Sequence, residues 1–209
     1  LASNRISLYA QDAFRLNTEA GYLTINGGLR MSYWDFNKEF LVSPRASVGF
    51  VPARNEQFSF RFATGLYYQA PFYKEYRMEQ TDNDGNTYIV LNHDIKSQRS
   101  LQFILGGDYT FRALNRPFRI SAELYYKNLS NIIPYEIDNL KVVYSGMNSS
   151  KGYATGIDFK FFGQFVEGTD SWISLSLMKT QEDLNGVKVP RPTDQRYSIA
   201  MYFTDYFPK

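Results

Sequence analysis

Apolar and polar residues alternate with a period of two along most of this 209-residue chain. Phe58, Phe60 and Phe62 fall on one face of an extended segment, whereas Ser59 and Arg61 fall on the other. Successive side chains of a β-strand point to opposite sides, so this alternation indicates a strand with one apolar and one polar face. The pattern recurs along the chain and predicts an all-β fold of antiparallel strands.

The alternation predicts nine strands. Several reach ten residues or more, whereas strands of soluble proteins centre on about 5–6 residues and membrane-spanning strands need roughly 9–11. The expected strands cover residues 5–14, 22–33, 45–51, 58–68, 101–111, 118–126, 153–162, 172–178 and 196–203.

The connections between these strands alternate in length. Short turns, rich in Asn, Gly, Pro and charged residues, are expected at residues 17–21, 52–57, 113–117 and 167–171. Long connections are expected at residues 34–43, 69–99, 128–152 and 179–195. Barrels of the bacterial outer membrane have short turns on one side and long loops on the other, whereas a soluble β-sandwich has no reason to keep its long loops at one end.

Aromatic residues make up 17% of the chain and flank both kinds of connection. Phe14 and Tyr22 flank a short turn, and Tyr67 and Tyr68 precede a long loop. Rings at both ends of the strands match two membrane interfaces, so we predict an antiparallel transmembrane β-barrel. Asp12 is an exception on the apolar face, which we attribute to a nearby short turn or to a β-bulge.

Nine strands do not close a bacterial barrel, which normally has an even number. No signal peptide opens the chain. We therefore expect residues 1–209 to form part of a single barrel domain, with a signal peptide, any further domain and the last strands lying outside this sequence.

The polar face of such a barrel would line its lumen, either facing water or contacting a plug. Small residues on this face, such as Gly49 and Gly156, leave space inside and favour a wide barrel. The charged residues expected to face the lumen or a plug are Arg30, Arg45, Arg61, Asp108, Glu123, Asp158 and Lys160.

The composition argues against several kinds of site. The net charge of +2 gives no basis for binding nucleic acid. The chain has no cysteine and His93 is its one histidine, so thiolate and multi-histidine metal sites and histidine-based dyads are excluded within it. We expect no enzyme activity, catalytic residue, metal site or cofactor.

Two short segments resemble functional motifs but are better explained as turns. Residues 82–86, with the sequence DNDGN, match a calcium-binding loop only in part, because the later glutamate is missing. Asp84-Gly85 and Asn185-Gly186 each lie between extended segments and predict tight hairpin turns.

The connection at residues 69–99 is the expected ligand-binding loop, because binding residues are often carried by loops on a rigid scaffold. Its candidate residues offer ring faces and hydrogen bonds suited to a polar ligand or a sugar. The alternative is that Tyr67, Tyr68 and Tyr73 only pack within the loop or lie at the membrane interface. The candidates are Tyr73, Tyr76, Arg77, Tyr88 and His93.

Several motifs, taken in order, resemble TonB-dependent receptors of the outer membrane. They are Ser43-Pro44-Arg45-Ala46-Ser47-Val48, then Tyr67-Tyr68-Gln69-Ala70-Pro71 after an intervening strand, and Tyr153-Ala154-Thr155-Gly156-Ile157-Asp158 after a long loop. The segment Pro190-Arg191-Pro192-Thr193-Asp194-Gln195-Arg196 is similar to versions from Bacteroidetes. The resemblance covers most of the chain.

The resemblance implies a barrel of about 22 strands filled by a plug domain. This chain would then be the C-terminal half of the barrel without its last strands, and the plug domain would lie outside this sequence. It also implies a place in the bacterial outer membrane, in contact with its lipid, and uptake powered by the TonB complex through a part of the receptor outside this sequence. The ligand would be scarce, such as a siderophore, cobalamin or a glycan. The alternatives are a passive channel or porin without a plug, and a soluble β-sandwich that binds carbohydrate or acts as an adhesin.

Overall fold

The structure is a computed structural model that describes residues 3–206, and it is built almost entirely of β-strands. Nine strands follow one another as antiparallel neighbours, which confirms the predicted fold class and number of main strands. They are β1 (Arg5–Thr18), β2 (Gly21–Trp34), β3 (Glu39–Pro52), β4 (Phe58–Gln69), β7 (Gln98–Ala113), β8 (Arg116–Ile132), β11 (Ser150–Gly163), β12 (Ser171–Leu184) and β14 (Tyr197–Tyr202).

The remaining elements belong to the long connections. They are the 3₁₀ turn η1 (Tyr73–Glu75) and the strands β5 (Arg77–Thr81), β6 (Thr87–Leu91), β9 (Tyr135–Asp138), β10 (Lys141–Tyr144) and β13 (Val187–Pro190). β5 pairs with β6 and β9 with β10, while β12 pairs with β13 near the loops and with β14 near the turns.

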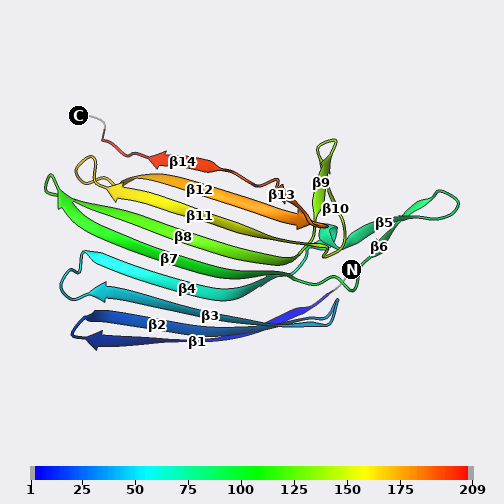
Figure 1. The fold of residues 1–209 in the computed structure, drawn as a ribbon, viewed down its shortest axis with the longest axis horizontal. Helices are drawn as coiled ribbons and strands as arrows, with labels where there is room; N and C mark the ends of the chain where they lie inside the picture. The colour runs from blue at the N-terminus through cyan, green and yellow to red at the C-terminus, as the bar shows by residue number, and fades with distance from the viewer. Residues whose placement is uncertain (1–2, 207–209) are drawn as a thin grey trace.

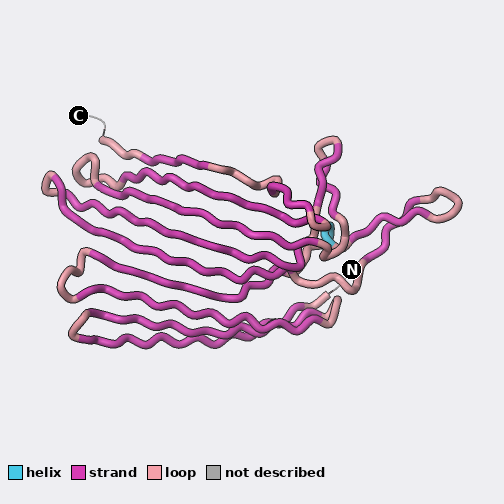
Figure 2. The backbone as a smooth tube through the Cα atoms, in the orientation of Figure 1, coloured by secondary structure: helices cyan, strands magenta, loops and turns pink. Residues whose placement is uncertain are grey.

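The sheet is a single open layer (Figure 1). Its short turns lie together at one end, and the projecting hairpins β5–β6 and β9–β10 lie at the other (Figure 2). Among residues 3–206, β1 and β14 do not pair with each other, so the layer does not close on itself.

The prediction of a long connection at residues 34–43 is wrong. β2 and β3 pair up to Trp34 and Glu39, and residues 35–38 alone join them. The strands therefore extend well past the length needed to cross a membrane. Beyond that length both faces of a strand can meet water or loops, so strict alternation of polarity no longer marks where the strand ends.

Both predicted hairpin turns are confirmed. In the β5–β6 hairpin, the Asp82 carboxylate accepts hydrogen bonds from the amides of Asp84 (3.0 Å) and Asn86 (2.8 Å). Between β12 and β13, Asn185 and Gly186 both have positive φ angles of 54° and 89°. Two consecutive residues with positive φ give a hairpin turn whose twist matches that of the flanking strands.

The register separates the two faces as the sequence predicts, and it places Asp12 on the apolar face opposite Gly27. Pairing of β1 with β2 is continuous from Arg5 to Thr18, so the β-bulge suggested for this residue is wrong. Asp12 also lies in the middle of its strand rather than beside the turn. Its carboxylate accepts a hydrogen bond from the Ala13 amide (2.8 Å), with space beside it because Gly27 has no side chain.

The buried core lies at the loop end of the sheet rather than across it. Trp34, Tyr76, Ile95 and Ile133 form a cluster in which each residue is at most 6% exposed. A single sheet layer cannot bury either face by itself, so burial is found where the long connections fold over the strand ends.

Glu39 anchors the longest connection to this core. Its carboxylate accepts hydrogen bonds from the Ser97 amide (3.0 Å) and the Ser97 hydroxyl (2.6 Å), and Ser97 is fully buried. Asn37 adds a bond to the Ile95 carbonyl (2.6 Å). The turn between β2 and β3 therefore fixes the residues that lead into β7.

We predict that Glu39→Ala loosens this connection in the intact protein. Hydrogen bonds to a charged group contribute about 2 kcal/mol, so local opening and tryptic cleavage after Lys96 should become about 30-fold faster. Cleavage is followed by mass spectrometry of the peptides. Glu136→Ala removes an exposed carboxylate from β9 and should leave the rate unchanged; equal rates in both variants would contradict the anchoring role of Glu39.

Candidate functional site

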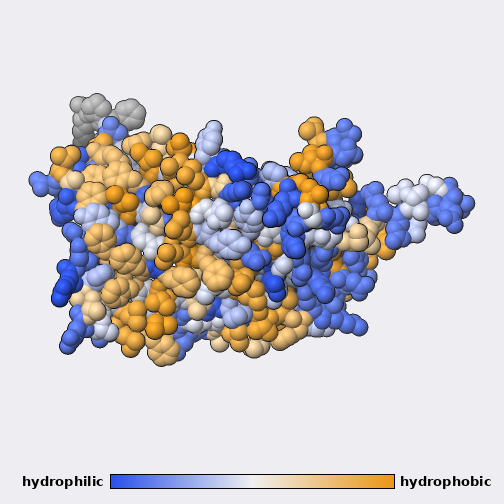
Figure 3. Space-filling view, in the orientation of Figure 1, coloured by the Kyte–Doolittle hydropathy of each residue, from blue (hydrophilic) through white to orange (hydrophobic). Residues whose placement is uncertain are grey.

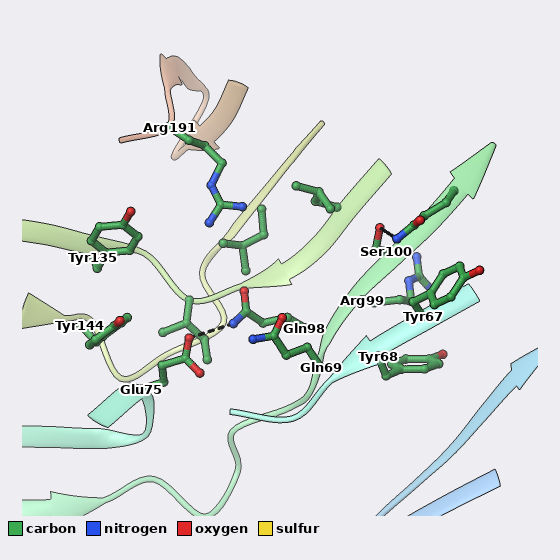
Figure 4. A pocket seen from close by; sticks show the side chains of 14 residues that line it. Tyr67, Tyr68, Gln69, Glu75, Gln98, Arg99, Ser100, Tyr135, Tyr144 and Arg191 are labelled. Carbon is green, nitrogen blue, oxygen red and sulfur yellow. Dashed lines mark hydrogen bonds between the residues drawn. The ribbon is translucent and has the colours of Figure 1, made fainter. Parts of the chain in front are cut away.

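The loop end of the sheet forms a cavity of about 410 Å³ (Figure 4). The ends of β4 and β7 contribute the amides of Gln69, Gln98 and Gln102. The hairpin β9–β10 adds Tyr135 and Tyr144. The lining thus combines amides and phenols with an apolar floor that includes Ile132 and Ile133, a mixture suited to an amphipathic organic ligand.

Glu75 orients one of these amides. The Gln98 side chain donates to its carboxylate (3.1 Å), which also accepts the Phe72 amide (3.0 Å). Burial raises the pKa of Glu75, while these two hydrogen bonds act in the opposite direction. Since the Gln98 nitrogen is directed to Glu75, the carbonyl oxygen of this amide is available to accept a hydrogen bond in the cavity.

Arg191 and Arg99 are the two cations that line the cavity, and the guanidinium of Arg191 points into it (Figure 4). Pro190 and Pro192 restrict the backbone on either side, because proline fixes its own φ and limits the residue before it. The Nε atom lies 3.4 Å from a Glu182 carboxylate oxygen, yet it is buried and has no hydrogen-bond partner among residues 3–206. The Nε side of Arg191 is thus held by Glu182, and the part of the guanidinium that points into the cavity is available to an anionic group.

A second polar group lies on the wall of the sheet around Arg61. Its guanidinium pairs with Asp108 and with Glu123, the latter at 3.2 Å. Gly106 on β7 lies opposite Arg61 on β4 and Glu123 on β8, and a Cβ there would come within 2.7 Å of the Arg61 Nε atom. The missing side chain thus makes room for the guanidinium.

All seven residues predicted to face a lumen lie on the polar face. Arg30 on β2 lies opposite Ser43, two residues from Arg45 on the same face of β3. The register places Arg61, Glu123 and Asp158 in one row across the sheet. The remaining two, Asp108 and Lys160, share a row with Ser121 between them. Contact of this face with a plug stays a prediction.

The structure does not bring the five predicted loop residues together. Tyr76 is buried against Trp34, and His93 stacks on Phe36 with ring centroids 4.3 Å apart. Tyr73 packs edge-on against Tyr76, with ring centroids 5.7 Å apart, which is the loop packing considered as the alternative for Tyr73.

The other two candidates, Arg77 and Tyr88, lie in the β5–β6 hairpin. None of the five lines the cavity around Arg191, and a ligand-binding role for them stays a prediction. Sequence reasoning missed Arg191, Gln98 and Glu75 as cavity residues. The position of Arg191 between two prolines was the one available signal, because a glutamine at the end of a strand has no distinctive pattern.

The outer face of the sheet has the polarity of a membrane-spanning wall. An apolar field covers the strands and gives way to hydrophilic residues at the turn end and at the loop end (Figure 3). Large apolar side chains, including Phe62 and Leu105, are 43% and 54% exposed on this face. With long antiparallel strands, short turns and long loops, these features define an outer-membrane β-barrel wall.

Comparisons with known proteins agree with this class. A family model described as TonB dependent receptor-like, beta-barrel matches residues 2–208, and the chain belongs to this family. It is also similar to the structure of the RagAB peptide transporter, with 11% sequence identity and a TM-score of 0.58, over 92% of this chain and 23% of that chain. None of the curated proteins matches it.

The chain therefore forms part of the wall of a bacterial outer-membrane β-barrel, in a family of receptors and transporters. It spans about a quarter of the length of the solved chain that it matches, 23%. Within residues 3–206, no helix is long and apolar enough to span a membrane, and no group of three metal-ligating side chains is present.

Adjacent residues on β7 test the assignment of the two faces. Leu105 lies on the apolar face near the middle of the strand, and Ile104 lies on the polar face. In the intact receptor, Leu105→Arg should lower the free energy of unfolding in lipid bilayers by about 2–4 kcal/mol, because it places a charge among acyl chains. Ile104→Arg should cost clearly less. Urea unfolding of refolded receptor measures both, and equal losses would contradict the assignment.

Proposed function

We propose that this wall belongs to a receptor that binds a scarce ligand outside the cell and imports it actively. The observation that carries the proposal is the cavity around Arg191, which lies at the loop end of a wall belonging to the TonB-dependent receptor family. Long loops face the outside of the cell in such barrels. The cavity would therefore hold the ligand before it is transported.

The ligand contacts of this cavity favour a molecule that carries a carboxylate or another anionic group. Arg191 would donate to that group, and the carbonyl of Gln98 would accept from an N–H or O–H group of the same ligand. A peptide has both kinds of group, and RagAB is named as a peptide transporter. A siderophore or an acidic glycan meets the same requirements.

The polar wall would support the plug of the receptor. Arg61 forms ion pairs with both Asp108 and Glu123, so the three side chains present a rigid pattern of charges with hydroxyl neighbours. A plug with complementary hydrogen-bonding groups could rest on this pattern and still move when pulled. The TonB complex would act on the plug, through a part of the receptor outside this sequence.

A passive channel is the second candidate, and dependence on energy separates the two. Wild-type cells and cells lacking the receptor gene are grown in one medium, and mass spectrometry identifies the compounds that the receptor removes from it. A protonophore should stop their removal if uptake is active. Continued removal in its presence would contradict active import and favour the channel.

Arg191→Gln tests the cavity in the same cells. Loss of a charged hydrogen bond costs about 1.5–3 kcal/mol, so uptake of the receptor-dependent compounds at low concentration should fall about 10- to 100-fold. Arg54→Gln alters an exposed arginine in the short turn before β4 and serves as the matched control. Equal uptake by both variants, at equal receptor levels in the outer membrane, would exclude Arg191 from ligand binding.

A further inference from the structure

Three exposed lysines gather on the outer face of the sheet, away from the cavity and the polar wall. They are Lys151 on β11, Lys179 on β12 and Lys188 on β13. The register places Lys151, Asp183 and Lys188 in one row across three strands, and it pairs Lys179 with Thr155 on the same face. The strand ends thus bring together cations from separate parts of the chain.

The acid in this row does not neutralise the lysines by direct pairing. The Asp183 carboxylate accepts the Gly186 amide (2.8 Å) and so stabilises the turn between β12 and β13. Within residues 3–206, no salt bridge within 4.0 Å involves any of the three lysines. Glu182 also borders this surface, but it is buried and paired with Arg191, so the three lysines and Asp183 leave the cluster with a positive charge.

The cluster lies at the rim of the apolar field. Leu177 precedes Lys179 by two residues on the same face of β12, and Ile157 and Tyr153 lead up to Lys151 on β11. The loop end faces outward from the cell, so this rim meets the outer leaflet where acyl chains give way to headgroups. Exposed lysines at that level attract phosphate groups.

Beside Lys151 and Lys188, the surface is hollowed by a cavity of about 180 Å³ whose lining also includes Tyr126, Tyr153 and Gln181. The two tyrosine rings stack with centroids 6.2 Å apart. The Tyr153 hydroxyl donates to the Gln181 side chain (2.7 Å), which fixes both groups. Aromatic faces beside an amide suit a sugar ring better than a small glycerol headgroup.

We propose that this cluster binds the phosphorylated sugar headgroup of an outer-leaflet glycolipid. The lysines contact its phosphate groups, and the tyrosine pair lies against its sugar. The acyl chains then run along the apolar outer face of β8, β11 and β12. This inference goes beyond the proposed import function and does not depend on the identity of the imported ligand.

The test uses intact receptor, purified in detergent and freed of bound lipid, with diphosphoryl lipid A as the probe. Native mass spectrometry measures its affinity for wild type and for the triple variant Lys151→Gln, Lys179→Gln and Lys188→Gln. Each lysine near a charged lipid surface contributes about fivefold, so the triple variant should bind about a hundredfold more weakly. Each single variant should lose about fivefold, which keeps the test valid if the triple variant folds poorly.

Two controls identify the source of the binding. The triple variant Lys74→Gln, Lys96→Gln and Lys141→Gln removes the same charge from exposed loop residues and should bind lipid A as wild type does. Dephosphorylated lipid A and phosphatidylglycerol should both bind wild type weakly. Unchanged affinity in the cluster variants would overturn the proposal, as would equal binding of phosphatidylglycerol and lipid A.

Discussion

The continuous antiparallel hydrogen-bond ladder is the constraint on which the rest of this structure depends. Inside a bilayer, water cannot satisfy backbone amides and carbonyls, so each strand must be paired along its whole membrane-spanning length. β7 and β8 pair without interruption, from Arg99 opposite Ser130 at one end to Ala113 opposite Arg116 at the other. Once the register is fixed, every side chain is committed to the lipid side or to the inner side, because a slip by one residue would exchange the two faces.

Because both faces of the strands are committed in this way, the buried core and the ligand cavity form at the ends of the strands. The outer face needs apolar residues for lipid, and the inner face needs polar groups that satisfy one another, as Arg61 and its two carboxylates do. The core around Trp34 and Ile95 therefore forms where the connections fold over the sheet. The cavity around Arg191 is built beside that core, on residues whose positions are set by the ladder and by two prolines. Such preorganisation lowers the entropy lost when a ligand binds.

The sequence was informative wherever one physical requirement acted on alternate residues. The period of two gave the strands, their faces and the polar set from Arg30 to Lys160, because lipid and water select different residue types at every second position. It failed at Trp34–Glu39, where both strands continue beyond the membrane and alternation no longer reports on environment. It also could not identify the cavity residues. Gln69 and Gln98 are 29 positions apart in the sequence and meet only because β4 pairs with β7. Of the loop residues predicted to bind a ligand, Tyr73, Tyr76 and His93 pack against other aromatic rings.

The end of β12 shows how one strand can serve two environments with neighbouring residues. Glu182 points to the inner side, where it accepts the Ser150 hydroxyl and lies beside Arg191. Asp183 points to the outer side, between Lys151 and Lys188, and stabilises the turn into β13. The same turn returns the chain to Pro190 and thus delivers Arg191 to the cavity. A change in the length of this hairpin would therefore shift the ligand cavity and the lipid-facing cluster together, because both depend on the register of β12 with β13.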